Sequence, residues 1–290
     1  MTTTLRLTYY PDITQKQTPQ AIHDAVEVFA HALALEITNL TGKPLEIKVP
    51  PVLTVKQQYE DILSGSSSFS LMKPVAYVLA HRVDPNIVPV SVAHRPIDGK
   101  VGTFYYGQVY ARRALGFTSL RDVLQYGAAK LRIAYGDRFS TSNFLIPAAL
   151  LQSAGVHPFL HFAQTTFAGG HDLAAEAVFK GESDLGAGHD GVIKILAQSE
   201  PTAPQELIQL ARENIHSDPV VVNLATLPTW LTLPLIQGAC ASVAKTAGVQ
   251  AALDLFWGWV KDLSATQHSN YASIEEALHR LKLTAADMIS

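Results

Sequence analysis

Two successive series of strand-like and helix-like segments run along this chain of 290 residues. The first series opens with an alternating, β-rich segment at residues 5–10 and continues with apolar residues at helical spacing over about 20–40. A second strand follows at 45–49, and further helix–strand pairs extend the series to residue 93. Such alternation is typical of an α/β fold built on a doubly wound parallel sheet.

The second series follows an extended segment near residues 101–111 and ends at another near 218–224. The extended segments predict two crossings between a first lobe of residues 1–100 plus 222–290 and a second lobe of 101–221. We expect the crossings to form a hinge and the ligand to bind in a cleft between the lobes, beyond the carboxyl ends of the strands. The expected elements are strands at 131–135, 161–167 and 183–187, helices near 119–126, from 142, and at 171–180, 190–198 and 204–213, and a mainly helical chain over 230–289 broken at Gly248 and Ser264.

Composition limits the classes of function. Hydrophobic residues make up 48% of the chain and charged residues 16%, which indicates a globular protein. A net charge of −3 gives no electrostatic case for a nucleic-acid partner. Cys240 is the one cysteine, so neither an intrachain disulfide nor a cysteine-based metal motif is expected.

No apolar run is long enough to span a membrane, and the first residues lack the apolar core of a secretory signal. The protein is therefore either cytoplasmic, or periplasmic (or otherwise extracytoplasmic) with its signal removed. We expect it to be a monomer.

A polar turn between the predicted strand at 131–135 and the next helix is the strongest candidate site. It contains Ser140, Thr141 and Ser142, which are favourable residues at a helix N-cap. The N-terminus of a helix offers unpaired N–H groups and the positive end of the macrodipole. Hydroxyls beside those groups predict a site for a small oxyanion. A plain capping turn is the alternative.

Two histidine–aspartate pairs also follow predicted strands. His171 and Asp172 come after two glycines, and His189 and Asp190 end a later strand. A histidine at such a place can donate a hydrogen bond to an oxyanion, whereas helix capping and a polar surface loop are the alternatives. The stretch 186–191 matches G-x-G-x-x-G, which leaves a nucleotide-dependent oxidoreductase as a weaker reading. We expect no metal and no cofactor.

Tyrosines and one acid complete the candidate residues. Tyr77, Tyr105 and Tyr106 lie near the predicted cleft, where a tyrosine closes a wall and donates a hydrogen bond; core packing is the alternative. Asp218 precedes Pro219 at the second crossing, where a simple turn residue is the alternative. The chain lacks a G-x-S-x-G elbow, a P-loop and H-E-x-x-H, so binding is favoured over catalysis and we expect no enzyme.

These motifs together resemble the phosphate/phosphite/phosphonate-binding proteins of ABC transporters. The resemblance rests on four segments, Gly136–Pro147, Gly169–Asp172, Asp184–Ala187 and Lys73–Tyr77. It implies a two-lobe α/β fold of the type II periplasmic-binding-protein kind that closes on its ligand and delivers it to an ABC permease. Lys73 stands where the family has glycine.

The resemblance also implies roles for individual residues. The hydroxyls and N–H groups of residues 140–142 would hold the phosphonyl oxygens, and His171 would add a donor. Tyr77 and Tyr105 would match the family's first-lobe and hinge tyrosines. Asp218 would read an amine or a protonated oxygen, and His189 and Asp190 would tune recognition of the side group.

We therefore expect a solute-binding protein that captures phosphonate, phosphite or phosphate. The alternative is an enzyme or small-molecule sensor that uses the same fold on a different metabolite, with the histidines and aspartates as acid–base groups.

Overall fold

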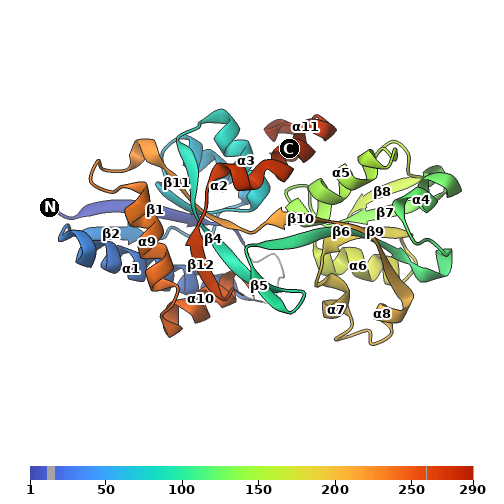
Figure 1. The fold of residues 1–290 in the computed structure, drawn as a ribbon, viewed down its shortest axis with the longest axis horizontal. Helices are drawn as coiled ribbons and strands as arrows, with labels where there is room; N and C mark the ends of the chain where they lie inside the picture. Colours follow the sequence, from blue (N-terminus) through green and yellow to red (C-terminus); the bar gives the residue numbers. More distant parts are fainter. Residues whose placement is uncertain (12–16, 259, 290) are drawn as a thin grey trace. The chain divides into compact units, whose positions relative to one another are not determined.

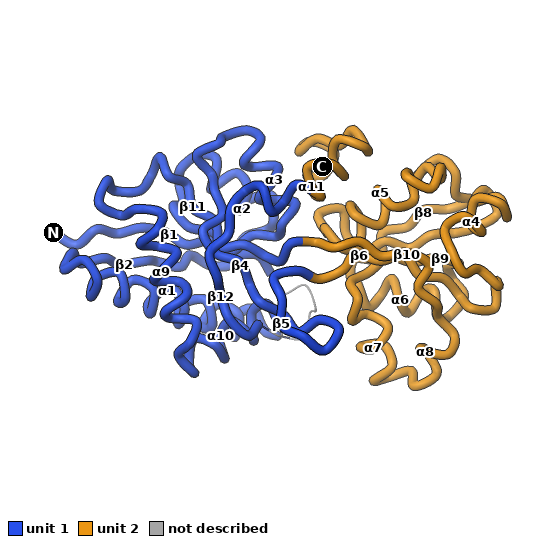
Figure 2. The backbone as a smooth tube through the Cα atoms, in the orientation of Figure 1, with its two compact units in different colours: residues 1–104, 216–272 blue, residues 105–215, 273–290 orange. Residues whose placement is uncertain are grey.

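The computed structural model describes residues 1–11, 17–258 and 260–289, which form two compact units. Unit 1 comprises Met1–Phe104 and His216–Ala272, and unit 2 comprises Tyr105–Ile215 and Ser273–Ser290 (Figure 2). The chain passes between units near the two predicted extended segments and again after residue 272. The division expected from the sequence had no third passage, because it kept residues 222–290 together. No helix among the described residues is long and apolar enough to cross a membrane.

Unit 1 is built on a mixed sheet with the strand order β12-β4-β11-β3-β1-β2, and a short strand β5 pairs with β4 (Figure 1). Its strands are β1 (Thr3–Tyr9), β2 (Leu45–Lys48), β3 (Phe69–Leu71), β4 (Ile87–Ile97), β5 (Lys100–Gly102), β11 (Pro219–Asn223) and β12 (Asp262–Ala265). Strand β1 pairs in parallel with β2 and β3, as predicted. Strand β4 runs in the same direction as these three, because β11 lies between β3 and β4 and pairs antiparallel with both. The sheet as a whole is mixed, since β11 and β12 come from the later part of the chain and β12 adds an antiparallel edge.

The helices of unit 1 cover both faces of this sheet, with α1, α9 and α10 on one side and α2 and α3 on the other (Figure 1). They are α1 (Pro19–Thr41), α2 (Val55–Leu63), α3 (Pro74–Val83), α9 (Leu233–Val243) and α10 (Ala247–Trp257). Helix α1 begins where the Thr18 hydroxyl accepts a hydrogen bond from the Ala21 N–H, and it ends at Gly42 in the left-handed conformation. Its predicted apolar face is buried in the main core of the unit.

Unit 2 has a five-stranded sheet with the order β10-β6-β9-β7-β8. Its strands are β6 (Phe104–Arg112), β7 (Arg132–Tyr135), β8 (Gln164–Phe167), β9 (Leu185–His189) and β10 (Leu207–His216). Its helices are α4 (Leu120–Tyr126), α5 (Ile146–Ser153), α6 (His171–Phe179), α7 (Val192–Leu196), α8 (Ala203–Glu206), α11 (Ala272–Leu281) and α12 (Ala285–Ile289). Strand β7 pairs in parallel with β8 and β9, so the carboxyl ends of the three strands lie at the same end of the sheet.

Two of three local predictions fail against this structure. The helix expected at 204–213 is mostly strand β10, which lies at an edge of the sheet and pairs with β6. Gly248 lies inside the first turn of α10 and does not break the chain there. Ser264 does interrupt the helices, but it does so within strand β12.

Candidate functional site

The turn after β7 differs in form from the regular helix start predicted from the sequence. Ser140 caps a π-helical turn, Thr141–Leu145, which leads into α5. The Ser140 hydroxyl oxygen accepts a hydrogen bond from the Asn143 N–H at 2.9 Å. Ser140, Thr141 and Ser142 are all buried, at 3–4% exposure. Their hydroxyls therefore lie in a largely water-excluded turn, where hydrogen bonds to an anion are stronger than in water.

Asn143 holds this turn against the end of β7. Its side-chain oxygen accepts a hydrogen bond from the Gly136 N–H. The amide nitrogen of Asn143 is buried and has no hydrogen-bond partner among the described residues. A Cβ atom at Gly136 would lie 2.5 Å from that nitrogen, so the turn closes this tightly only because residue 136 is glycine.

Gly136→Ala is expected to destabilise the protein by about 1–3 kcal/mol, the usual cost of overpacking a closed site. Gly238→Ala is the matched control, because a Cβ at Gly238 meets nothing within 4 Å. Urea denaturation followed by circular dichroism compares the two variants. An unfolding midpoint for Gly136→Ala equal to that of the control would show that the turn can open without cost.

His171 and His189 lie beside the turn. His171 opens α6, and its Nε2 atom is 3.4 Å from the Ser140 hydroxyl oxygen. His189 ends β9, and its ring centroid is 4.9 Å from that of His171. The His189 N–H donates to Nδ1 of His171 at 3.4 Å, and the Gly191 N–H donates to Nδ1 of His189 at 3.0 Å. In the neutral rings the proton therefore resides on Nε2, so each histidine presents a hydrogen-bond donor there.

Asp190 joins the end of β9 to the beginning of β6. Its carboxylate accepts a hydrogen bond from the Tyr106 N–H at 3.3 Å, and its own N–H donates to the Tyr106 carbonyl at 3.2 Å. The Arg212 guanidinium lies 3.9 Å from the centre of the Tyr106 ring. Tyr105 is buried near the beginning of β6. Unit 2 therefore brings Ser140, His171 and His189 together, with Asp190 next to them in the chain.

Tyr77 and Asp218 belong to unit 1. Tyr77 is fully buried in α3, and its hydroxyl is 2.7 Å from Nδ1 of His268. Asp218 is 5% exposed and forms an ion pair with Arg95. Nothing in the sequence indicates Arg95 as the partner of Asp218, because the two residues lie 123 positions apart in the chain and no local motif marks Arg95.

Other readings of the histidines and glycines find no support in this geometry. The described residues contain no group of three or more His, Cys, Asp or Glu side chains that could hold a metal ion. Gly186 and Gly188 lie within strand β9, not in a turn that opens a helix. A Cβ at Gly186 would meet the Tyr110 ring at 2.6 Å, and one at Gly188 would meet Val192 at 2.8 Å. Close packing therefore explains the glycines that mimic a nucleotide-binding fingerprint.

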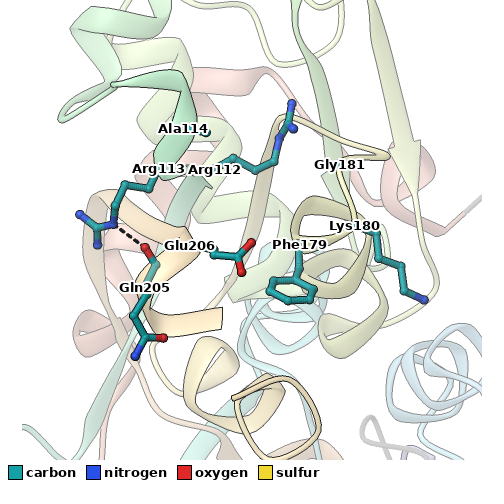
Figure 3. A pocket seen from close by; sticks show the side chains of 8 residues that line it. All are labelled: Arg112, Arg113, Ala114, Phe179, Lys180, Gly181, Gln205 and Glu206. Atoms are coloured by element: carbon teal, nitrogen blue, oxygen red, sulfur yellow. Dashed lines mark hydrogen bonds between the residues drawn. The ribbon is translucent and has the colours of Figure 1, made fainter. Parts of the chain in front are cut away.

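A pocket of about 420 Å³ in unit 2 lies away from the turn (Figure 3). Its lining residues are Arg112, Arg113, Ala114, Phe179, Lys180, Gly181, Gln205 and Glu206. Arg112 pairs with Asp184, which directly precedes β9, whereas His189 is the last residue of that strand. A strand rises about 3.3 Å per residue, so the pocket lies at the opposite edge of the sheet from Ser140.

Comparison with known proteins gives one family and one fold. A family model described as "ABC transporter, phosphonate, periplasmic substrate-binding protein" matches residues 13–271. The phosphate-import protein PhnD of Mycolicibacterium smegmatis is 29% identical over 140 residues, which are 46% of this chain and 42% of that relative. The match therefore spans less than half of the relative's length.

Solved structures extend the likeness over nearly the whole chain. PhnD1 of Prochlorococcus marinus in complex with methylphosphonate has a TM-score of 0.71 at 20% identity, with 96% of this chain and 98% of that chain covered. A Xanthomonas citri protein bound to ATP has a TM-score of 0.72 at 14% identity, with 97% and 98% covered. At these identities the likeness concerns the fold alone, and it confirms the predicted α/β fold class of periplasmic binding proteins.

Proposed function

This chain belongs to the family of periplasmic phosphonate-binding proteins of ABC transporters, and we propose that it captures a small phosphorus oxyanion at the turn of residues 136–142. Phosphonate, phosphite and phosphate are the candidate ligands. The family is one of transport proteins that bind a substrate. Delivery to an ABC permease, a periplasmic location and closure of two lobes on the ligand belong to the same proposal.

The observation that carries this proposal is the buried hydroxyl turn beside His171. The Ser140 hydroxyl oxygen accepts a hydrogen bond from the Asn143 N–H. This bond uses a lone pair of the oxygen, so the hydroxyl hydrogen can still be donated to an anion. Nε2 of His171 lies 3.4 Å from the same hydroxyl and is a donor in the neutral ring. Hydroxyl, imidazole and N–H donors all suit an oxyanion. Because the net charge of the chain is −3, such an anion must be held by these local dipoles and not by an overall positive charge.

The groups that surround this turn favour an anionic ligand. Thr141 and Ser142 are as deeply buried as Ser140, so their hydroxyls are shielded from water, which strengthens their hydrogen bonds to a charged group. The Arg138 guanidinium lies 4.9 Å from the centre of the Phe167 ring, on the loop that precedes the cap. It adds a positive charge to the same loop, which favours an anion in the turn.

A thermal-shift and calorimetry screen tests the proposal with phosphate, phosphite, methylphosphonate, aminoethylphosphonate and sulfate. A ligand present at 100 times its dissociation constant stabilises the folded protein by about 2.7 kcal/mol. We expect a rise of several degrees in Tm with at least one phosphorus oxyanion and none with sulfate. No shift with any phosphorus oxyanion would overturn the proposal and favour the enzyme or sensor alternative, which turnover assays with small metabolites would then test.

A further inference from the structure

An exposed arginine lies within the turn of residues 136–142 in unit 2. Arg138 is two residues before Ser140, and its guanidinium lies over the Phe167 ring, 4.9 Å from the ring centre. Among the residues that the structure describes, Arg138 has neither an ion-pair partner nor a hydrogen-bond partner. A guanidinium that lies over a ring engages it through its face, so the N–H groups at its edge remain free to donate. These donors are therefore available to a ligand beside Ser140.

The sheet of unit 2 holds Phe167 against this turn. Phe167 is the last residue of β8 and pairs with Tyr135, the last residue of β7. Beyond the two strands, the Gly169 N–H donates a hydrogen bond to the Gly136 carbonyl at 2.8 Å. The loops that follow β7 and β8 therefore run side by side, and the ring under Arg138 is fixed next to the turn.

The Ser140 hydroxyl is within reach of the Arg138 side chain. The Cα atoms of the two residues are at most about 7 Å apart, because a fully extended chain spans about 3.3–3.6 Å per residue. The long arginine side chain covers this distance by rotation about its own bonds while the loop stays in place. His171 approaches the same hydroxyl from the neighbouring loop, with its Nε2 atom 3.4 Å from the oxygen. An anion bound here can accept hydrogen bonds from a hydroxyl, an imidazole and a guanidinium together.

The fixed charges of the two loops make this cation important for an anion. Residues 136–142 and 168–172 contain two acids, Asp137 and Asp172, and a single arginine, Arg138. Both acids repel an incoming anion, and Arg138 offsets one of them. The Coulomb energy between a ligand and a fixed charge is proportional to the charge of the ligand. Arg138 therefore contributes more to the binding of a doubly charged anion than to that of a singly charged one.

We propose that Arg138 is a ligand-binding residue, which donates hydrogen bonds to the phosphorus oxyanion and favours its doubly charged form over its singly charged form. The inference rests on the proposed function and deepens it, since it names a cation of that site and the charge of the ligand. The planar guanidinium matches two oxygens of a phosphorus oxyanion. Phe167 positions the guanidinium at the turn through the stacking contact.

Calorimetric titration of the full chain with methylphosphonate and with its monomethyl ester tests this inference. At mildly alkaline pH methylphosphonate carries two negative charges and the ester one, because the ester has a single ionisable oxygen. We expect Arg138→Met to weaken methylphosphonate binding by about tenfold or more, since a hydrogen bond to a charged group is worth roughly a 10- to 100-fold change in affinity. The loss for the ester should be at least about threefold smaller, because its charge is half as large. Arg138→Lys keeps the charge and should recover part of the affinity.

Lys130→Met is the matched control. Lys130 is also exposed, and its Nζ atom lies 5.5 Å from the centre of the Tyr126 ring. Lys130 precedes β7, whereas Arg138 follows it, so the control removes the same charge at the opposite end of the strand. Its affinity for methylphosphonate should equal that of the wild type.

Three outcomes would contradict the inference. Because Arg138 is exposed, we expect Arg138→Met to fold with the wild-type Tm, and Arg138→Lys gives a second variant if it does not. Equal binding of methylphosphonate by the wild type and Arg138→Met would overturn the inference and leave the proposed function intact. An equal loss for methylphosphonate and its ester would also overturn it. Failure of the wild type to bind phosphate, phosphite or methylphosphonate would overturn both the inference and the proposed function.

Discussion

Replacing Ser140 and Thr141 by alanine is expected to weaken methylphosphonate binding by about 100-fold or more. A hydrogen bond to a charged group is worth about 1.5–3 kcal/mol, which is roughly a 10- to 100-fold change in affinity for each hydroxyl removed. Both hydroxyls are buried, so water cannot easily take their place beside the anion. Calorimetric titration of the double variant and of each single variant measures the loss.

The effect on affinity must be separated from the loss of a helix cap. Ser140→Ala removes the bond from the Asn143 N–H, which costs about 1 kcal/mol of stability on its own. Thr18 is a matched control, because its hydroxyl caps α1 by accepting from the Ala21 N–H at 3.2 Å. Thr18→Ala should lose comparable stability and keep the wild-type affinity. Equal binding by wild type and the Ser140/Thr141 double variant would refute the oxyanion turn.

The elements that sequence reasoning predicted well are those that local signals determine. Helix α1 is an example, because the Thr18 cap, the apolar face and the terminal Gly42 lie within or next to the helix itself. Strand β10 is the opposite case. Its residues carry apolar side chains at a spacing that also suits a helix, and pairing with β6 decides the matter in favour of a strand.

The same division between local and distant determinants holds for the candidate site. Ser140 was identifiable as a cap, because a polar residue between a strand and a helix is a local signal. The π-helical form of the turn was not, since it depends on Asn143 reaching back to Gly136 at the end of β7. The ion pair joins Arg95, in β4, to Asp218, just before β11; the two residues are 123 positions apart, and no spacing rule connects them.

Asp184→Asn is expected to destabilise the protein by about 2–3 kcal/mol at pH 7, because it removes a negative charge that two arginines share and breaking a buried ion pair is strongly destabilising. Arg112 Nη2 donates to one carboxylate oxygen at 2.6 Å, and Arg132 Nε donates to the other at 3.0 Å. The Asp184 side chain is 9% exposed, while the two arginines are about one-third exposed. Glu176→Gln, which breaks an exposed pair with Lys180, is the control and should cost about 0–1 kcal/mol.

The destabilisation should depend on pH with a definite sign. Burial tends to raise the pKa of Asp184, but hydrogen bonds from the side chain and N–H of Arg132 and from Arg112 outweigh it, so the pKa is lowered in the folded protein. The contribution of this carboxylate to stability is therefore complete above about pH 4, the ordinary value of an unfolded aspartate, and is lost as the pH falls through the lower folded-state value. Unfolding followed by circular dichroism should show the gap between wild type and Asp184→Asn at pH 7 shrinking towards pH 2. Circular dichroism is the appropriate probe here, because Asp184 lies in unit 2. All three tryptophans lie in residues 216–272 of unit 1, so tryptophan fluorescence would report on the other unit. A gap that stays constant down to pH 2 would mean that the carboxylate charge is not what holds Arg112 and Arg132 in place.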